Sequence, residues 1–142
     1  GLGDPVFDKL DADLAKAMIS LPAAKGVEIG LGFRGTRMLG SQHNDAILDA
    51  RGATASNHAG GINGGISNGN ELEFRIAVKP TSSIRREQQT VDLKSGETAP
   101  LRIQGRHDAC IALRVPPVLE AVTACALADL LLLEQRIPRV WR

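Results

Sequence analysis

A glycine-rich segment directly ahead of an alternating strand constrains the fold of this chain more than any other feature. Residues 60–69 hold five glycines in ten positions. Such a run makes a sharp bend or a close backbone contact, or it lets backbone amides approach a phosphate or a flat ring. The alternation that follows puts apolar side chains on one face, namely Leu72, Phe74, Ile76 and Val78. This pattern predicts a half-buried strand.

The remaining pattern predicts two helices, a second strand and a hairpin around this strand. Apolar residues recur at helical spacing near the N-terminus, and a long apolar run with few polar interruptions follows Pro116–Pro117. We expect the second helix to be buried and to supply the largest block of the core. In chain order the predicted elements are a helix over 6–18 ended by Pro22, a strand over 25–30, an excursion over 31–58, the strand over 72–78, a hairpin of 90–93 and 101–103 around a turn at 94–97, and a helix over 118–135. Together they predict an α+β fold, a layered domain of helices and antiparallel sheet.

Length and charge narrow the class of protein. The chain has 142 residues, which predicts a single domain over residues 1–142. Its net charge is +1 and it has only three Phe, one Trp and no Tyr, so we expect no nucleic-acid partner. The apolar run from 118 to 133 is interrupted by polar residues, so we expect no membrane span. The two cysteines have no metal-ligand spacing, and we expect reduced thiols in a cytoplasmic protein with no bound metal.

Lys79 to Ser83 form the strongest candidate for an anion-binding site. The run reads Lys79, Pro80, Thr81, Ser82, Ser83 and follows directly on the predicted strand. A lysine and three hydroxyls at a strand end can donate several hydrogen bonds to phosphate oxygens. The same residues are also compatible with an ordinary turn in which Thr and Ser bond their own backbone.

A second candidate lies at Gly105-Arg106-His107-Asp108. If this loop is buried, Arg106 would hold a carboxylate or phosphate and would keep Asp108 ionised as a proton acceptor. If it is exposed, the two form an ion pair of little energetic value. Of the other histidines, we expect His43 to be solvated, whereas His58 would either order the glycine loop or touch a ligand.

Several ordered runs together resemble the C-terminal part of the chorismate synthase family. The resemblance covers essentially the whole chain but less than half of a family member. The runs are 1–7, 10–14, 25–30, 56–61, 79–83 and 105–108.

The resemblance implies an enzyme that uses reduced FMN. Members of the family release phosphate from 5-enolpyruvylshikimate 3-phosphate by 1,4-elimination, which gives chorismate for aromatic amino-acid biosynthesis. By resemblance the protein is a homotetramer, and the fold is part of a β-α-β sandwich. Asp108 would be catalytic, as the residue that receives or relays the proton passing through the flavin. The implied flavin-binding residues are Pro22, Ala23, Gly64, Lys79, Pro80, Thr81, Ser82, Ser83 and Arg106.

Some residues depart from the family pattern. Pro22 stands where many relatives carry asparagine, Leu31 where aspartate is common, and Ala109 where proline is usual. The N-terminal half of the family, with its Ser-His-Gly motif, a second catalytic histidine and several substrate-binding arginines, has no counterpart here. We therefore expect incomplete chemistry and unpaired strand edges from these residues alone. A non-catalytic flavin-binding or assembly fragment is the alternative.

Overall fold

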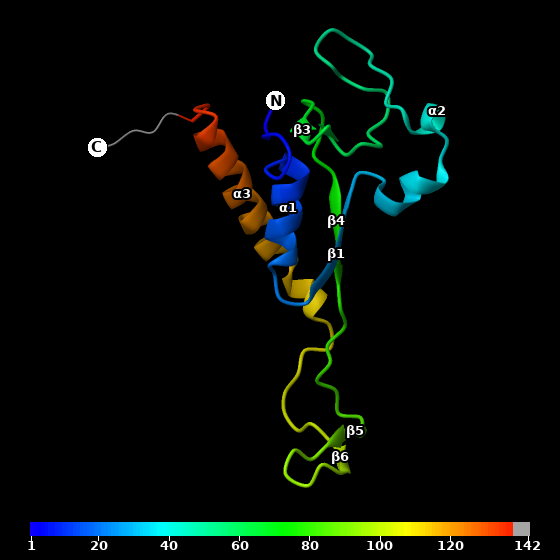
Figure 1. Ribbon diagram of the computed structural model, residues 1–142, viewed down its shortest axis with the longest axis vertical. Coiled ribbons are helices and arrows are strands. Elements are labelled where there is room, and N and C mark those ends of the chain that lie inside the picture. The colour runs from blue at the N-terminus through cyan, green and yellow to red at the C-terminus, as the bar shows by residue number, and fades with distance from the viewer. Residues whose placement is uncertain (138–142) are drawn as a thin grey trace, which may run out of the picture.

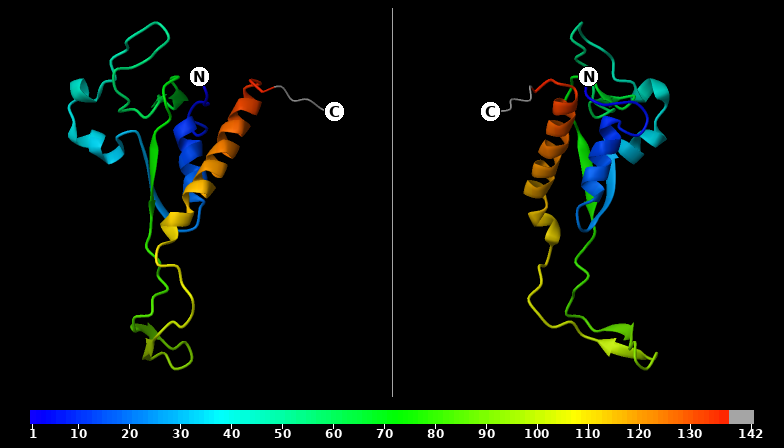
Figure 2. Two further views of the ribbon diagram at one scale, coloured as in Figure 1. Left: turned by 180° about the vertical axis from the view of Figure 1, so that it is seen from behind. Right: turned by 60° about the vertical axis from the view of Figure 1, so that its left-hand side comes forward.

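A two-stranded antiparallel ribbon runs along the centre of the molecule, with two helices side by side on one of its faces (Figure 1). The ribbon consists of β1 (Ala24–Ile29) and β4 (Phe74–Val78), and the helices are α1 (Leu10–Ile19) and α3 (Pro116–Leu133). Seen from behind and from the side, α1 lies next to both α3 and the ribbon (Figure 2). The computed structural model describes residues 1–137. The predicted α+β class is confirmed.

The core is centred on α1. Leu10, Leu14 and Met18 recur every four residues along one face of this helix and are fully buried. Leu10 and Leu14 form a cluster with Ile62 from the glycine-rich segment and Leu130 from α3. Three segments distant in the sequence are thus held together by one small apolar cluster.

The first helix begins later than the spacing of apolar residues predicts. Val6 and Phe7 are exposed and lie outside it, so the predicted start at residue 6 is wrong. Val6 has φ +66°, in the left-handed region that interrupts a right-handed helix. The helix starts at Leu10, whose amide donates to the carbonyl of Gly65 at 2.8 Å. The glycine-rich segment therefore satisfies a backbone group at the start of α1.

The glycine-rich segment itself is a tight hairpin of β2 (Ile62–Asn63) and β3 (Ile66–Ser67). Gly64 and Gly65 make the turn with φ of +60° and +85°, as a turn of this type requires. A side chain at Gly65 would collide with Lys9 at the start of α1. Of the two interpretations of this segment, the bend is confirmed.

The alternation predicted for β4 is confirmed, because its even-numbered residues are half-buried and its odd-numbered residues exposed. β4 pairs with β1 through Val27 opposite Ile76 and Ile29 opposite Phe74. Directly after β1, Gly30 has φ +56°, and a Cβ there would collide with the backbone carbonyl of His58. This glycine lets the chain between 56 and 61 lie against the end of β1.

Helix α3 contributes less to the core than predicted. Its 18 residues are apolar almost throughout, yet Leu130 is the one residue of this helix that is buried. The reason is that such a helix needs neighbours on several sides, and among residues 1–137 α1 is the helix that packs against it. By length and mean hydropathy, 1.7, α3 could also cross a membrane, a test that core helices of soluble proteins pass as well. Cys125 on this helix and Cys110 before it are both free, as predicted.

The excursion over 31–58 contains η1 (Gly32–Arg37), a short 3-10 helix, and the single turn α2 (Gly40–His43). One isolated bridge, Ile47 opposite Thr54, closes the loop beyond them. The predicted long excursion is confirmed. It occupies the same end of the molecule as the β2–β3 hairpin (Figure 1).

A separate hairpin extends from the opposite end of the ribbon (Figures 1 and 2). Its strands are β5 (Gln88–Val91) and β6 (Thr98–Leu101), which pair from Gln88 opposite Leu101 to Val91 opposite Thr98. The predicted hairpin is confirmed, but both strands lie earlier than expected. The turn decides the register, because the Asp92 side chain accepts from the amide of Lys94 and pairing starts directly beside it.

Candidate functional site

The Lys79–Ser83 run begins where β4 leaves the ribbon. The amide of Lys79 donates to the carbonyl of Ala23 at 2.9 Å, just before β1. Ala23 has φ +68°, so the chain turns sharply between α1 and β1. The structure therefore brings Ala23, and with it the preceding Pro22, beside the start of the proposed anion-binding site.

Two predicted site segments line one hollow of about 430 Å³, at the base of the hairpin. The first segment contributes Pro80, Thr81 and Ser83, and the second contributes Asp108. The hollow thus brings hydroxyl donors and a carboxylate together although about 25 residues separate them in sequence. The lining residues are Pro80, Thr81, Ser83, Ile84, Arg85, His107, Asp108 and Ala109.

The side-chain hydroxyl of Thr81 is the feature that points to a ligand. Its Oγ1 is buried and has no hydrogen-bond partner among the described residues. Buried hydroxyls are normally paired, because an unpaired one costs about 1–3 kcal/mol. Lys79 is exposed next to it and forms no ion pair within residues 1–137. An ammonium group and free hydroxyls are a donor set that fits the phosphate of a flavin mononucleotide.

The ion-pair partner of Asp108 is an arginine that the sequence motif did not indicate. Its Oδ1 lies 3.0 Å from Nη2 of Arg114, and no ion pair with Arg106 forms in the described structure. The predicted pairing of Asp108 with Arg106 is therefore wrong. Arg114 closes the 3-10 helix η2 (Ile111–Arg114), which turns the chain back so that position 114 returns to position 108. The only sequence signal was an unassigned arginine six residues after the acid.

Of the nine predicted flavin-binding residues, three line the hollow, namely Pro80, Thr81 and Ser83, and six do not: Pro22, Ala23, Gly64, Lys79, Ser82 and Arg106. Arg106 is exposed and is absent from its lining. Gly64 lies in the β2–β3 turn, which contacts the first residue of α1, whereas Ala23 follows the last turn of the same helix. Ten helical residues span about 15 Å, so Gly64 and the Lys79–Ser83 run are at opposite ends of α1. Their roles toward the flavin stay predictions.

A second polar cluster surrounds Asp45 in the excursion. Its carboxylate accepts from the Ser56 hydroxyl at 2.6 Å and from the amides of His58 and Ala59 at 2.8 and 2.9 Å. Burial raises the pKa of Asp45, but these hydrogen bonds and the nearby imidazole outweigh it, and the pKa lies below its usual value. This cluster orders the glycine loop, which is one of the two roles expected for His58.

His43 is held in the same cluster. Its backbone carbonyl lies 3.1 Å from Nδ1 of His58, and the two rings stack at a tilt with centroids 5.7 Å apart. His43 is half-buried, so the expectation that it is simply solvated is wrong. In the sequence His43 is only one residue of a polar segment, and the fold of this loop places its ring against that of His58.

Comparison with known proteins identifies the family. The family model described as "Chorismate synthase" matches residues 1–132. The chain belongs to the chorismate synthase family. A chorismate synthase of Chitinophaga pinensis is 61% identical over 142 residues, covering 100% of this chain and 43% of the relative. One of Opitutus terrae is 56% identical over 131 residues, covering 91% of this chain and 36% of the relative.

The solved structures agree with the sequence relatives. A structure titled "Crystal Structure of Chorismate Synthase" superposes with a TM-score of 0.72 at 34% identity, over 94% of this chain and 34% of that chain. The chain thus spans less than half the length of the relatives that it matches.

Proposed function

We propose that this chain is the C-terminal portion of a chorismate synthase. The enzyme would release phosphate from 5-enolpyruvylshikimate 3-phosphate by reduced-FMN-dependent 1,4-elimination, acting as a cytoplasmic homotetramer. The proposal is supported by family membership, and by the hollow in which Thr81, with its unpaired hydroxyl, and Asp108 lie together.

In this proposal the Lys79–Ser83 run binds the phosphate of the flavin. Lys79 supplies a positive charge, and the hydroxyls of Thr81, Ser82 and Ser83 donate hydrogen bonds. The unpaired Oγ1 of Thr81 would gain a partner when the cofactor binds. Reduced FMN, when bound, supplies electron density beside the reacting carbons without net oxidation of the substrate.

Asp108 acts as the proton acceptor. In a 1,4-elimination the electrons of the broken C–H bond form one new double bond, the existing double bond shifts by one position, and the C–O bond to phosphate breaks with its electrons leaving on phosphate. An ionised carboxylate can take the released proton. Arg114, 3.0 Å from one carboxylate oxygen, orients Asp108 and leaves its other oxygen, Oδ2, available to accept the proton.

Asp108→Asn tests this role in the complete protein that contains these residues. We expect phosphate release to fall about 10²- to 10⁴-fold, because an amide cannot accept the proton. Flavin affinity should stay within about twofold, since the side chain keeps its size. Asp129→Asn, an exposed carboxylate on α3, is the matched control. Unchanged turnover of the Asp108 variant would remove it from the mechanism.

Lys79→Ala tests the flavin site by titration with FMN. Loss of one charged hydrogen-bond donor costs about 1.5–3 kcal/mol, so FMN affinity should fall about tenfold or more. Lys94→Ala, in the turn of the β5–β6 hairpin, should leave it unchanged. Equal affinities for the two variants would mean that Lys79 does not contact the flavin.

The alternative is a non-catalytic flavin-binding or assembly fragment. The exposed apolar surface of α3 favours it, because among residues 1–137 α1 is the helix that packs against α3 and much of the apolar surface of α3 stays uncovered. Phosphate release by the complete protein, with none by the 142-residue chain, would show that the residues act only as part of the enzyme. Activity of the 142-residue chain itself would contradict incompleteness.

A further inference from the structure

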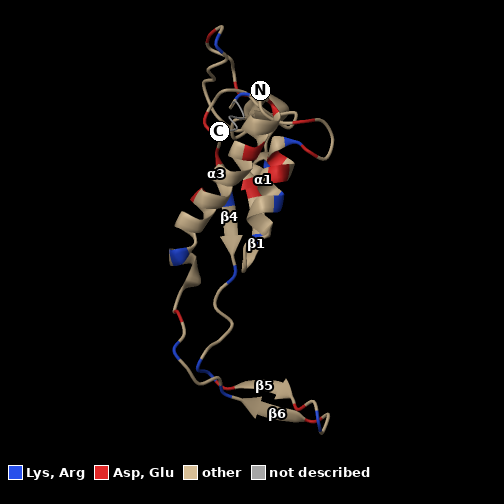
Figure 3. Cartoon of the chain, turned by 90° about the vertical axis from the view of Figure 1, so that its left-hand side faces the viewer, with Lys and Arg blue, Asp and Glu red and all other residues tan. Residues whose placement is uncertain are grey.

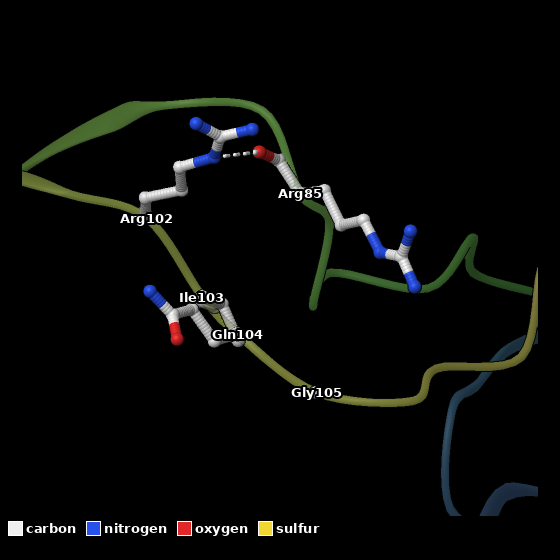
Figure 4. A pocket seen from close by; sticks show the side chains of 5 residues that line it. All are labelled: Arg85, Arg102, Ile103, Gln104 and Gly105. Carbon is white, nitrogen blue, oxygen red and sulfur yellow. Dashed lines mark hydrogen bonds between the residues drawn. The ribbon is translucent and has the colours of Figure 1, made fainter.

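Two arginines line a second hollow at the base of the β5–β6 hairpin (Figure 4). We call it the neck hollow. It has a volume of about 270 Å³, and its lining consists of Arg85, Arg102, Ile103, Gln104 and Gly105. Arg102 follows directly on Leu101, the last paired residue of β6, and Arg85 lies three residues before Gln88, the first paired residue of β5. The hairpin thus brings the Arg102 side chain to the backbone of Arg85, whose own exposed side chain extends to the other side of that carbonyl (Figure 4).

One hydrogen bond fixes Arg102 across the neck. Its Nε donates to the backbone carbonyl of Arg85 at 3.2 Å, which is the dashed line in Figure 4. A guanidinium has five N–H donors, and this bond uses one of them. The two Nη groups of Arg102 remain available in a side chain whose position is already restricted, which lowers the entropy lost on binding a ligand.

The arginines of the neck lack carboxylate partners. Among residues 1–137, Arg51, Arg75, Arg114 and Arg136 form ion pairs within 4.0 Å, whereas Arg34 and Arg37 in η1 and Arg85, Arg86, Arg102 and Arg106 in the neck do not. Lys and Arg colour both segments of the neck in Figure 3. Concentrated positive charge without an internal partner favours an anion from outside these residues.

The neck hollow adjoins the candidate active site. Arg85 lines both hollows. On the outgoing segment, Gly105 lines the neck hollow and His107 lines the other one, and a Cβ at Gly105 would lie 3.2 Å from Nε2 of His107. An anion bound between the arginines would therefore be a neighbour of the hollow that contains Asp108, separate from the Lys79–Ser83 run.

We propose that Arg85 and Arg102 form a binding subsite for inorganic phosphate, the leaving group of the reaction. This inference rests on the proposed function. Phosphate near neutral pH carries up to two negative charges, which match the two guanidinium groups, and its oxygens accept paired N–H donors from arginine. The Gln104 side chain lines the same hollow and can donate through its amide. The subsite receives phosphate as it leaves the neighbouring hollow.

The test measures binding of inorganic phosphate to the complete protein at low ionic strength, by calorimetry, without flavin or substrate. Arg102→Gln should weaken phosphate binding about tenfold or more. Arg85→Gln should have the same effect and serves as the second variant in case Arg102→Gln does not fold. Arg86→Gln is the matched control, because the adjacent arginine is absent from the lining of the neck hollow. We expect it to change affinity by less than about twofold.

Equal loss of phosphate affinity in Arg86→Gln and Arg102→Gln would overturn the subsite, because it would indicate attraction by diffuse charge. Unchanged phosphate affinity in Arg102→Gln would overturn it as well. The proposed function can be refuted independently of this subsite. If Arg102→Gln loses phosphate binding but the wild-type protein releases no phosphate from the shikimate ester, the subsite stands and the lyase assignment falls. In an active enzyme, added phosphate should inhibit turnover of the wild type more strongly than that of the Arg102 variant.

Discussion

Replacement of Arg114 would separate the positioning of Asp108, the proposed proton acceptor, from the stability of the fold. Arg114 touches Asp108 through a contact of 3.0 Å, and the two side chains are 77% and 41% exposed. An ion pair this exposed contributes about 0.2–1 kcal/mol to folding. The free energy of unfolding of Arg114→Gln should therefore stay within about 1 kcal/mol of the wild type.

Turnover should respond far more strongly. Without Arg114 the carboxylate of Asp108 can rotate away from the substrate, and a misplacement of about 1 Å in a reacting group can cost about 10²-fold in rate. That corresponds to about 2.7 kcal/mol of transition-state stabilisation. Because Arg114 contacts Asp108 and does not line the hollow, kcat should fall with little change in KM.

The assay is steady-state phosphate release by the complete protein with reduced FMN. Arg114→Lys retains the charge and should recover part of the lost kcat, which a purely structural role would not require. Arg51→Gln breaks a comparably exposed pair with Asp49 at 3.1 Å and should leave kcat unchanged. A kcat of Arg114→Gln within about twofold of the wild type would refute the positioning role. Equal losses in both arginine variants would refute it as well.

Two further predictions concern the fold of the complete protein, measured by urea unfolding. Leu14→Ala removes a fully buried side chain from the core cluster and should cost about 2.7–5 kcal/mol, whereas Ile19→Ala, at a position 48% exposed, should cost less than half as much. Asp45→Asn should destabilise at neutral pH, because it disrupts the carboxylate that accepts from Ser56, His58 and Ala59. Since the pKa of Asp45 is lowered in the folded state, its contribution is complete above the ordinary value of 3.8 and disappears as pH falls through the folded value. The difference between wild type and Asp45→Asn should therefore narrow in acid, and a difference independent of pH would contradict this account.

Local periodicity predicted most of the elements of this chain but not their ends. The alternation at Leu72 to Val78 survives in β4, because the period of two places one face of a strand on the core regardless of its partner. The start of α1 was missed, because it depends on the contact between Leu10 and Gly65. The burial of α3 was overestimated, because apolar composition specifies a need for neighbours and cannot supply them.

For the candidate site, residue identities alone indicate the kinds of groups that are present: a lysine with three hydroxyls at Lys79 to Ser83, an acid at Asp108, and the family to which they belong. Which of these groups lie close together depends on the fold. It placed Thr81 and Asp108 on one hollow, exchanged Arg106 for Arg114 as the partner of the acid, and joined Arg85 to Arg102 across the neck. The physical reason is that donor chemistry belongs to each residue, whereas distance between residues far apart in sequence depends on strand register and turns.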